Sequence, residues 1–127
     1  MKTTEENNKL IAEFMGKHEG YDFRIFNTGT WEFQTPENMR TILPYKFTSG
    51  ANKQEYFSTT IFKGYETKFH TSWDWLMPVV QKILVLKNTY GQERQKVFKA
   101  ITPDIRITYT AVIAFIEWHN AQQPLTN

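Results

Sequence analysis

Two pairs of a histidine and a carboxylate come closest to a metal-binding pattern. His70 precedes Asp74 by four residues, and Glu117 precedes His119 by two. Residues four apart lie on one face of a helix, so the first pair could approach a common ion. A metal site needs three or more converging ligands, and the chain has no cysteine to complete such a set. We therefore expect no metal site, and we interpret His70 as hydrogen-bonded within the fold or exposed.

Hydroxyl groups that could act as nucleophiles occur together at Ser58, Thr59 and Thr60. They fall in a predicted strand, and the chain lacks the GxSxG turn that exposes a nucleophilic serine in hydrolases. The six glycines are dispersed, and neither GxGxxG nor GxxxxGK[ST] occurs to cradle a phosphate. The sequence thus predicts no catalytic residue and no cofactor. A catalytic site assembled from distant residues would leave no motif, which keeps an enzyme as an open alternative.

The strongest charge asymmetry of the chain lies between residues 82 and 99. A single acid, Glu93, stands there against the basic residues Lys82, Lys87, Arg94, Lys96 and Lys99. The ordinary interpretation of such a run is a solvated helix face. The alternative is a basic edge that binds an anionic small molecule, a nucleotide or a nucleic-acid strand, with Tyr90 as a stacking ring.

The stretch HTSWDWLMPVVQKI, residues 70–83, predicts the start of a helix that runs to about Leu86. With Thr71 as its N-cap, Asp74 stands at the third helical position, where a carboxylate closes a capping box and meets the positive end of the helix dipole. Pro78 then falls in the second turn and removes the hydrogen bond to the Asp74 carbonyl, which predicts a kink.

The two tryptophans of this stretch cannot share one face of the helix. The face that we predict to be core carries Trp73, Met77, Val80 and Leu84. Trp75 is rotated from Trp73 by about 200°, so it must pack on another element or lie at the surface. We expect Trp75 and Tyr90 to be exposed contacts, with the loop at residues 49–54 as a possible rim of the same surface.

Three further helices are predicted outside this stretch. Thr3 and Glu6 match a capping box for a helix at residues 4–15. Residues 93–101 favour a short helix. The last helix has Thr102 as its predicted N-cap, Pro103 at its first position and an end near Ala121.

Strands are predicted between the first helix and the tryptophan stretch. Alternating residues from Phe23 to Phe33, with NTGT as the turn, predict one hairpin. A short strand is expected at residues 45–48, and a second hairpin is expected from residues 55–62, a turn at Lys63 and Gly64, and residues 65–69. The prediction is a single α+β domain, residues 1–127, in which an antiparallel sheet is covered by N-terminal, central and C-terminal helices.

Composition narrows the class of protein. Aromatic residues make up 16% of the chain, more than a small core is expected to hide, so some rings are expected at a groove or interface. The net charge of +2 is mild and its basic residues are spread, unlike a dedicated nucleic-acid binder. No signal peptide is recognisable, and no apolar run reaches the ~18 residues that span a bilayer. We therefore expect a cytoplasmic protein without membrane contact.

Three stretches of the chain read NNKLIAEFMG (residues 7–16), FHTSWDWLMPVVQKI (69–83) and YTAVIAFIEWHN (109–120). They resemble blocks like NxLIAEFMG, YHSSWDWLMPVVEKI and VYxAVVEFIxWYN in a family of small bacterial and phage proteins of uncharacterised function. More loosely, the chain is similar to a phage alpha-beta-alpha sandwich domain. The resemblance implies a fold and a phage or mobile-element setting, and it brings no catalytic residues. His119 stands where that family usually has tyrosine.

The sequence therefore favours a non-enzymatic accessory factor that works by binding another macromolecule, with a protein as the expected partner. The warrants are the aromatic surplus, the absence of catalytic motifs and the resemblance. The alternative is the binder of an anionic small molecule or nucleotide at residues 82–99. A weak hydrolase would require a pocket with a perturbed carboxylate or histidine. The oligomeric state stays open.

Overall fold

The described elements follow the order that the sequence predicts, with one helix first, then the strands, and then the remaining helices. The computed structural model describes residues 2–17, 20–35, 44–46, 55–57, 61–86 and 91–122, with the strands at 44–46 and 55–57 described by their backbone alone. The elements are α1 (Thr4–Met15), β1 (Asp22–Ile25), β2 (Trp31–Gln34), β3 (Pro44–Lys46), β4 (Glu55–Phe57), β5 (Phe62–Lys63), the 3₁₀ turn η1 (Gly64–Glu66), α3 (Trp73–Val85), α4 (Gly91–Lys99) and α5 (Ile105–Gln122). The predicted α+β class is confirmed.

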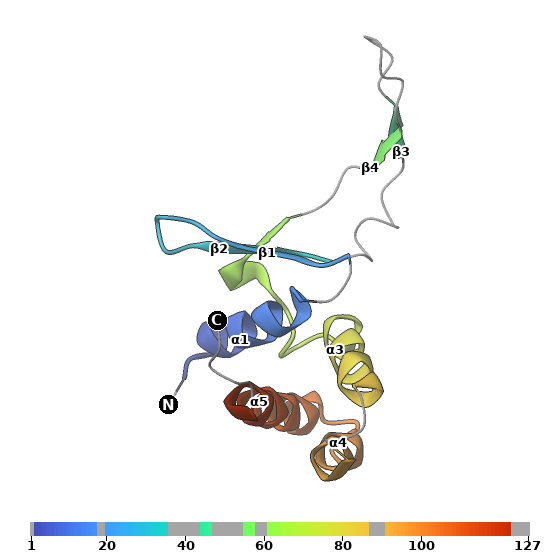
Figure 1. Cartoon of the computed structure of the whole chain (residues 1–127). Helices are drawn as coiled ribbons and strands as arrows, with labels where there is room; N and C mark the ends of the chain where they lie inside the picture. Colours follow the sequence, from blue (N-terminus) through green and yellow to red (C-terminus); the bar gives the residue numbers. More distant parts are fainter. Residues whose placement is uncertain are drawn as a thin grey trace.

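The strands form two sheets. β1, β2 and β5 pair antiparallel in that spatial order, and β3 pairs with β4 in a separate two-stranded sheet. Figure 1 shows the α-helices together on one side of the three-stranded sheet, with α1 nearest to it and α4 farthest away. Within the described residues, every helix is too short or too polar to cross a bilayer.

The first helix and the first hairpin form as predicted, because their signals are local. Thr3 Oγ1 accepts a hydrogen bond from the Glu6 amide at 3.1 Å, and the Glu6 carboxylate accepts one from the Thr3 amide at 2.8 Å. These bonds hold the pKa of Glu6 below its usual value. In the hairpin turn, Gly29 adopts φ of 84°, a conformation that glycine reaches without steric cost.

The predicted second hairpin is wrong. β5 pairs with β2 instead of with the residues that follow it, and Gly64–Glu66 form a 3₁₀ turn where a strand was expected to begin. Local bonds close this turn: the Glu66 carboxylate accepts from the Lys63 amide at 3.0 Å, and Thr67 Oγ1 donates to the Gly64 carbonyl at 2.7 Å. Such bonds from side chain to backbone compete with strand pairing.

Two helix starts lie later than predicted. α3 begins at Trp73 with Ser72 as its N-cap, so Asp74 occupies the second position, and no side chain caps this end. Thr71 and Ser72 instead donate their amides to the Lys68 carbonyl, which extends the preceding turn by one residue. The predicted capping box is therefore wrong, whereas Pro78 does lie inside the helix and its kink stays a prediction.

The last helix begins at Ile105 because Asp104, and not Thr102, caps it. The Asp104 carboxylate accepts from the Arg106 amide at 3.0 Å, while the Thr102 hydroxyl accepts from the Asp104 amide at 3.2 Å and holds a turn before the helix. The predicted short helix at 93–101 is confirmed as α4, two residues earlier in the chain.

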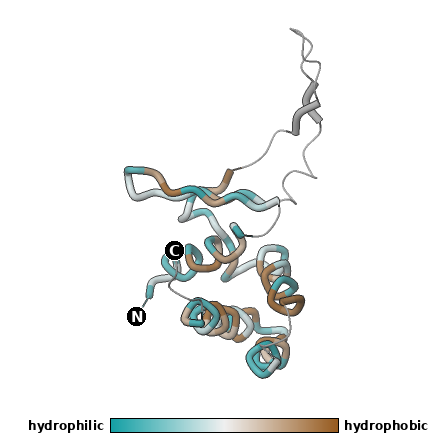
Figure 2. The backbone as a smooth tube through the Cα atoms, in the orientation of Figure 1, coloured by the Kyte–Doolittle hydropathy of each residue, from teal (hydrophilic) through white to brown (hydrophobic). Residues whose placement is uncertain are grey.

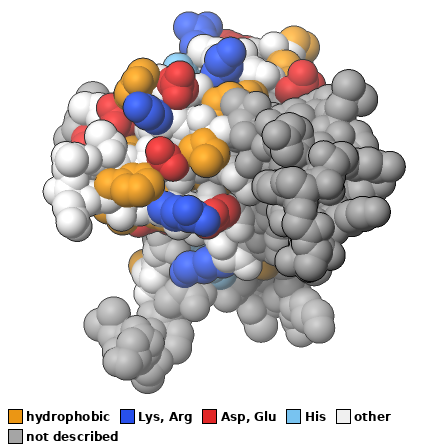
Figure 3. Space-filling view, turned by 90° about the horizontal axis from the view of Figure 1, so that it is seen from above, with side chains coloured by type: hydrophobic (Ala, Val, Ile, Leu, Met, Phe, Trp, Pro, Cys, Tyr) orange, Lys and Arg blue, Asp and Glu red, His pale blue; other side chains and the backbone are white. Residues whose placement is uncertain are grey.

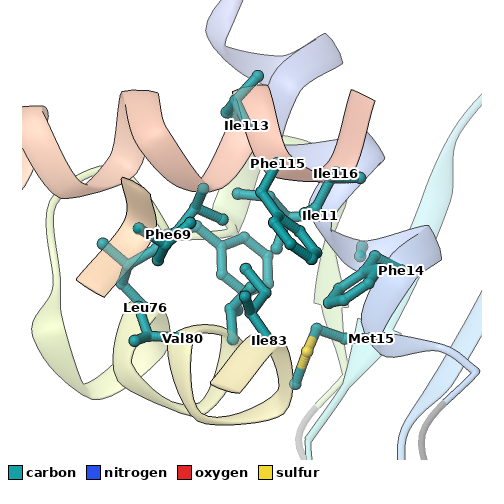
Figure 4. Packing of buried hydrophobic residues seen from close by; sticks show 14 of the residues in the cluster. Ile11, Phe14, Met15, Phe69, Leu76, Val80, Ile83, Ile113, Phe115 and Ile116 are labelled. Atoms are coloured by element: carbon teal, nitrogen blue, oxygen red, sulfur yellow. The ribbon is translucent and has the colours of Figure 1, made fainter. Parts of the chain in front are cut away.

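One core joins α1, α3 and α5 to the inner face of the sheet. Figure 4 shows Ile11, Phe14 and Met15 of α1 beside Ile116 of α5 and Ile83 of α3. The other buried apolar side chains are Ala12, Trp31, Phe33, Phe69, Leu76, Val79, Val80, Val97, Val112, Ile113 and Phe115. Figure 2 shows that the helices carry both hydrophobic and hydrophilic segments, as expected for helices with one buried face.

The buried face of α3 differs from the predicted one. Leu76, Val79 and Ile83 are fully buried, whereas Met77 is 40% exposed. Trp73 and Leu84 lie at the border and are partly buried against the core. Val80 of the predicted face is buried, at 1% exposure, so the prediction holds for that residue, and the rest of the buried stripe is rotated toward Leu76, Val79 and Ile83.

Candidate functional site

The described members of the basic run have different surroundings. Arg94 donates from Nη1 to the carbonyls of Leu84, at 3.1 Å, and Leu86, so it caps the C-terminal end of α3. Lys96 pairs with Glu93 at 3.0 Å, and Lys99 is exposed. Arg94 is thus a capping residue and not a free cation. Lys87, Tyr90 and the loop at 49–54 lie outside the described residues.

Lys82 points away from the rest of this run and reaches the C-terminal end of α1. Its Nζ donates to the Phe14 carbonyl and lies 4.2 Å from the centroid of the Phe14 ring. Burial, and after it the charge of Lys17, lowers the pKa of Lys82 to about 8. The structure therefore groups Lys82 with residues of α1, a neighbourhood that spacing along the chain does not reveal.

His119 belongs to the same neighbourhood. Its ring meets the Phe14 ring edge-on at 5.7 Å and stacks on Phe115 at 6.1 Å. Burial lowers the pKa of His119, and the charges of Lys17 and Lys82 lower it further. Its predicted neighbour Glu117 instead pairs with Lys2 at 2.9 Å. Among the described residues, no group of three or more metal-ligating side chains converges.

Trp75 is half-buried, so its predicted exposure is wrong. Its ring meets Phe62 of β5 edge-on at a centroid distance of 4.5 Å and Phe69 at 5.2 Å. Of the two alternatives for Trp75, packing on another element or lying at the surface, the structure shows the first. Phe62 belongs to β5 at the edge of the sheet, and Phe69 belongs to the segment after η1. The sequence did not indicate this contact, because the predicted pairing of β5 was a different one.

Replacing Trp75 by alanine is expected to lower the free energy of unfolding by about 2 kcal/mol, because two edge-on ring contacts and the buried part of the indole are lost. Urea unfolding of the purified variant measures this. Tyr65→Ala is the matched control, since the Tyr65 side chain is 71% exposed and should cost little. A Trp75→Ala protein as stable as the control would restore the surface role predicted from the sequence.

A buried amide links three distant parts of the chain. Asn8 of α1 is 2% exposed, and its Nδ2 lies 3.4 Å from the Thr67 carbonyl and 3.1 Å from His70 Nδ1. Its Oδ1 accepts from the Tyr109 hydroxyl of α5 at 2.8 Å. Burial raises the pKa of Tyr109 to about 12, which keeps this hydroxyl a donor. We call these four residues the Asn8 network.

The Asn8 network fixes the form of His70. A carbonyl only accepts, so the amide nitrogen of Asn8 must face Thr67, and the same NH₂ group donates to His70 Nδ1. His70 Nδ1 is therefore unprotonated and the proton of the neutral ring lies on Nε2. The interpretation of His70 as hydrogen-bonded is confirmed, although its partner is Asn8 and not Asp74. The signal in the sequence is a polar Asn8 on the apolar face that Ile11 and Met15 define.

The outer face of the three-stranded sheet carries mixed charges. Arg24 pairs with Asp22 at 3.0 Å, and Glu32 lies opposite Lys63 across β2 and β5. Figure 3 views the molecule from above and shows blue, red and orange side chains interspersed there. Opposite charges at short spacing cancel, so this described face favours neither an anionic nor a cationic ligand.

A hollow opens between α3 and α4. It has a volume of about 320 Å³ and is lined by Leu84, Gly91, Arg94, Gln95 and Phe98. Phe98 is 57% exposed and Val85, next to Leu84, is 69% exposed. Figure 1 shows α4 at the outer edge of the helical layer, where it contacts α3 and α5. Val97 is the buried residue of α4. We call this opening, with the five residues that line it, the α3–α4 hollow.

A second hollow, of about 420 Å³, lies at the C-terminal end of α1. Glu13, Phe14, Gly16, Lys17, Phe23 and Asn120 line it. Two of these residues, Phe14 and Lys17, are the ones that Lys82 approaches. We call it the α1 hollow.

Comparison of the chain with family models, with curated proteins and with solved structures finds no match.

Proposed function

We propose that the protein is a binding protein that docks an apolar and acidic segment of a partner protein in the α3–α4 hollow. The observation that carries this proposal is the exposure of the Phe98 ring in an open depression at the outer edge of the helical layer, which Leu84 of α3 also lines. Exposed apolar side chains that gather at a hollow mark interaction surfaces more often than single scattered ones do.

The packing of α4 supports the same proposal. Its buried residue is Val97, while Phe98 turns an aromatic ring outward. A ring in that position adds nothing to the core that Val97 reaches. Aromatic side chains are among the residues that dominate protein interfaces, which gives Phe98 a use at the surface that the fold does not supply.

Charge decides which partner fits. Arg94 lines the hollow and keeps its positive charge although it caps α3, because it donates to neutral carbonyls. Lys99 follows Phe98 in the chain and has no ion pair among the described residues. Lys96 and Glu93 neutralise each other. The surface is therefore apolar with a positive surplus, so the partner segment carries an apolar anchor flanked by carboxylates. The role as an accessory factor of phage or mobile-element origin, and the cytoplasmic location, stay predictions.

Replacing Phe98 by alanine tests the proposal. Because the ring is mostly exposed, the melting temperature should stay within about 2 °C of wild type, while affinity for the partner should fall at least about tenfold. Partners are captured on immobilised wild-type protein, identified by mass spectrometry and then measured one by one by titration calorimetry.

The matched control is Tyr65→Ala, which removes an even more exposed ring on η1. A partner of the α3–α4 hollow is retained by the Tyr65→Ala protein and lost by the Phe98→Ala protein. Equal retention of every partner by both variants would contradict the proposal.

A further inference from the structure

The outer edge of β1 has no partner strand among the described residues. β2 lies between β1 and β5, so β1 is an edge strand of the three-stranded sheet. Edge strands expose backbone N–H and C=O groups that can pair with another chain. This edge is therefore a place where a second strand can extend the sheet.

The hairpin shows which backbone groups of β1 face this edge. The Phe26 amide donates to the Thr30 carbonyl at 2.9 Å, across the hairpin, so it points to the side of β2. The register continues from there through β1 without a bulge, and the direction of the backbone groups alternates along an antiparallel strand. The N–H and C=O groups of Phe23 and Ile25 consequently point away from β2. Neither residue makes a backbone hydrogen bond to the described residues outside the helices and strands.

The charged side chains of β1 select the partner. Asp22 and Arg24 are two residues apart, so both lie on the outer face of the sheet, where their side chains are 41% and 66% exposed. When β1 pairs antiparallel with a second copy of itself about a two-fold axis at Phe23, Asp22 of each copy lies opposite Arg24 of the other. Opposite charges in directly opposed positions favour strand pairing. The edge is thus complementary to itself.

The other register that uses the same backbone groups is unfavourable. A two-fold axis at Arg24 also brings the outward groups of the two strands together, but it places the two arginines directly opposite each other, where like charges repel. With the axis at Phe23, the two Phe23 residues exchange both of their N–H···O=C bonds. Charge therefore decides between the two registers in favour of the axis at Phe23.

The inner face offers apolar surface next to the new strand. The Phe23 ring packs on Trp31 at a centroid distance of 5.6 Å and lines the α1 hollow, which has a volume of about 420 Å³. The second Phe23 ring lies beside the first on this face, and such cross-strand aromatic pairs stabilise a sheet. Ile25, which is 56% exposed, is covered by the second copy as well. The pairing thus removes apolar side chains from water.

We propose that the protein forms a symmetric dimer in which the β1 strands of two copies pair antiparallel about Phe23 and join their sheets into one continuous sheet. The two copies contribute the same surface, as in most homodimers. β1 has four residues, so the contact is small and the dimer is weak, with a dissociation constant on the order of 100 μM.

Sedimentation equilibrium of the intact protein over increasing concentration tests the proposal, and wild type should pass from monomer to dimer. Asp22→Lys and Arg24→Glu should each weaken dimerisation at least about tenfold, because each places like charges opposite each other across the two-fold axis. An equimolar mixture of these two variants should form heterodimers, since the two positive side chains of one variant then face the two negative side chains of the other. Circular dichroism checks that each variant is folded.

Ile25→Pro tests the backbone part of the pairing. Proline removes the N–H that points away from β2 and leaves the bonds between β1 and β2 in place, as edge strands allow. The circular dichroism spectrum should therefore stay that of wild type, while dimerisation should weaken at least about tenfold. Ile25→Val is the matched control, because it keeps the N–H and an apolar side chain, and it should dimerise like wild type.

A wild-type protein that stays monomeric at millimolar concentration would overturn the proposal, and so would a dimer that Asp22→Lys, Arg24→Glu and Ile25→Pro leave unchanged. A mixture of the two charge variants without heterodimers would overturn the register about Phe23. Phe98 belongs to α4 and not to β1, so these results do not depend on whether a partner protein binds in the α3–α4 hollow.

Discussion

Replacing Asn8 by leucine is expected to lower the free energy of unfolding by about 3 kcal/mol or more. Leucine has the same branched shape as asparagine and is somewhat larger, so no cavity arises, but the Thr67 carbonyl, His70 Nδ1 and the Tyr109 hydroxyl all lose their partner. Each polar group left without a hydrogen bond in a buried site costs about 1–3 kcal/mol. Urea unfolding followed by circular dichroism measures the change.

Tyr109→Phe is the matched control for the Asn8 network. It removes one hydroxyl and leaves the bonds from Asn8 to Thr67 and His70 in place, so a loss of about 1 kcal/mol is expected. The double variant should lose less free energy of unfolding than the sum of the two single losses, because both substitutions remove the same hydrogen bond. Equal stability of Asn8→Leu and wild type would show that the network does not hold the three segments together.

Replacing Gly64 by alanine is expected to cost about 3 kcal/mol, near the upper end for overpacking. An added Cβ would lie 2.3 Å from Trp31 Nε1 and 2.4 Å from Trp31 Cε2. The Trp31 ring is 2% exposed and contacts Phe23 at a centroid distance of 5.6 Å, so it has no free volume into which to move. Thermal and urea unfolding should both report the loss.

Gly91→Ala is the control for this substitution. Gly91 begins α4, and apart from its chain neighbours and the backbone of its own helix nothing lies within 4 Å of an added Cβ, so the variant should be as stable as wild type or slightly more stable. A Gly64→Ala protein that unfolds at the same urea concentration as Gly91→Ala would contradict the close packing of Gly64 on Trp31.

Signals that act over a few residues could be read from the sequence. The capping box at Thr3 and Glu6 and the positive φ at Gly29 each involve neighbours in the chain, and both elements form as predicted. The predicted pairing of β5 is wrong because its real partner is distant in the sequence. A strand of two residues has too little alternation to reveal its partner, and its pairing with β2 depends on contacts across about thirty positions.

The candidate sites also contain contacts that the sequence indicates and contacts that only the complete fold creates. The α3–α4 hollow forms between helices that follow one another, yet its exposed Phe98 was not predicted because the orientation of α4 is set by Val97 and the Arg94 cap. The sequence singles out Lys82 by its charge, but its neighbours Phe14 and His119 come from opposite ends of the chain. Contacts of that kind leave no pattern in spacing, because the whole fold creates them.

The Asn8 network also bears on the order in which a ribosome completes this fold. Asn8 leaves the ribosome 101 residues before Tyr109 does. Lys2 and Glu117 repeat this pairing of early and late segments, and Figure 1 shows α1 and α5 side by side. α1 therefore keeps part of its apolar face uncovered until α5 has been synthesised, so it completes its packing long after it has left the ribosome.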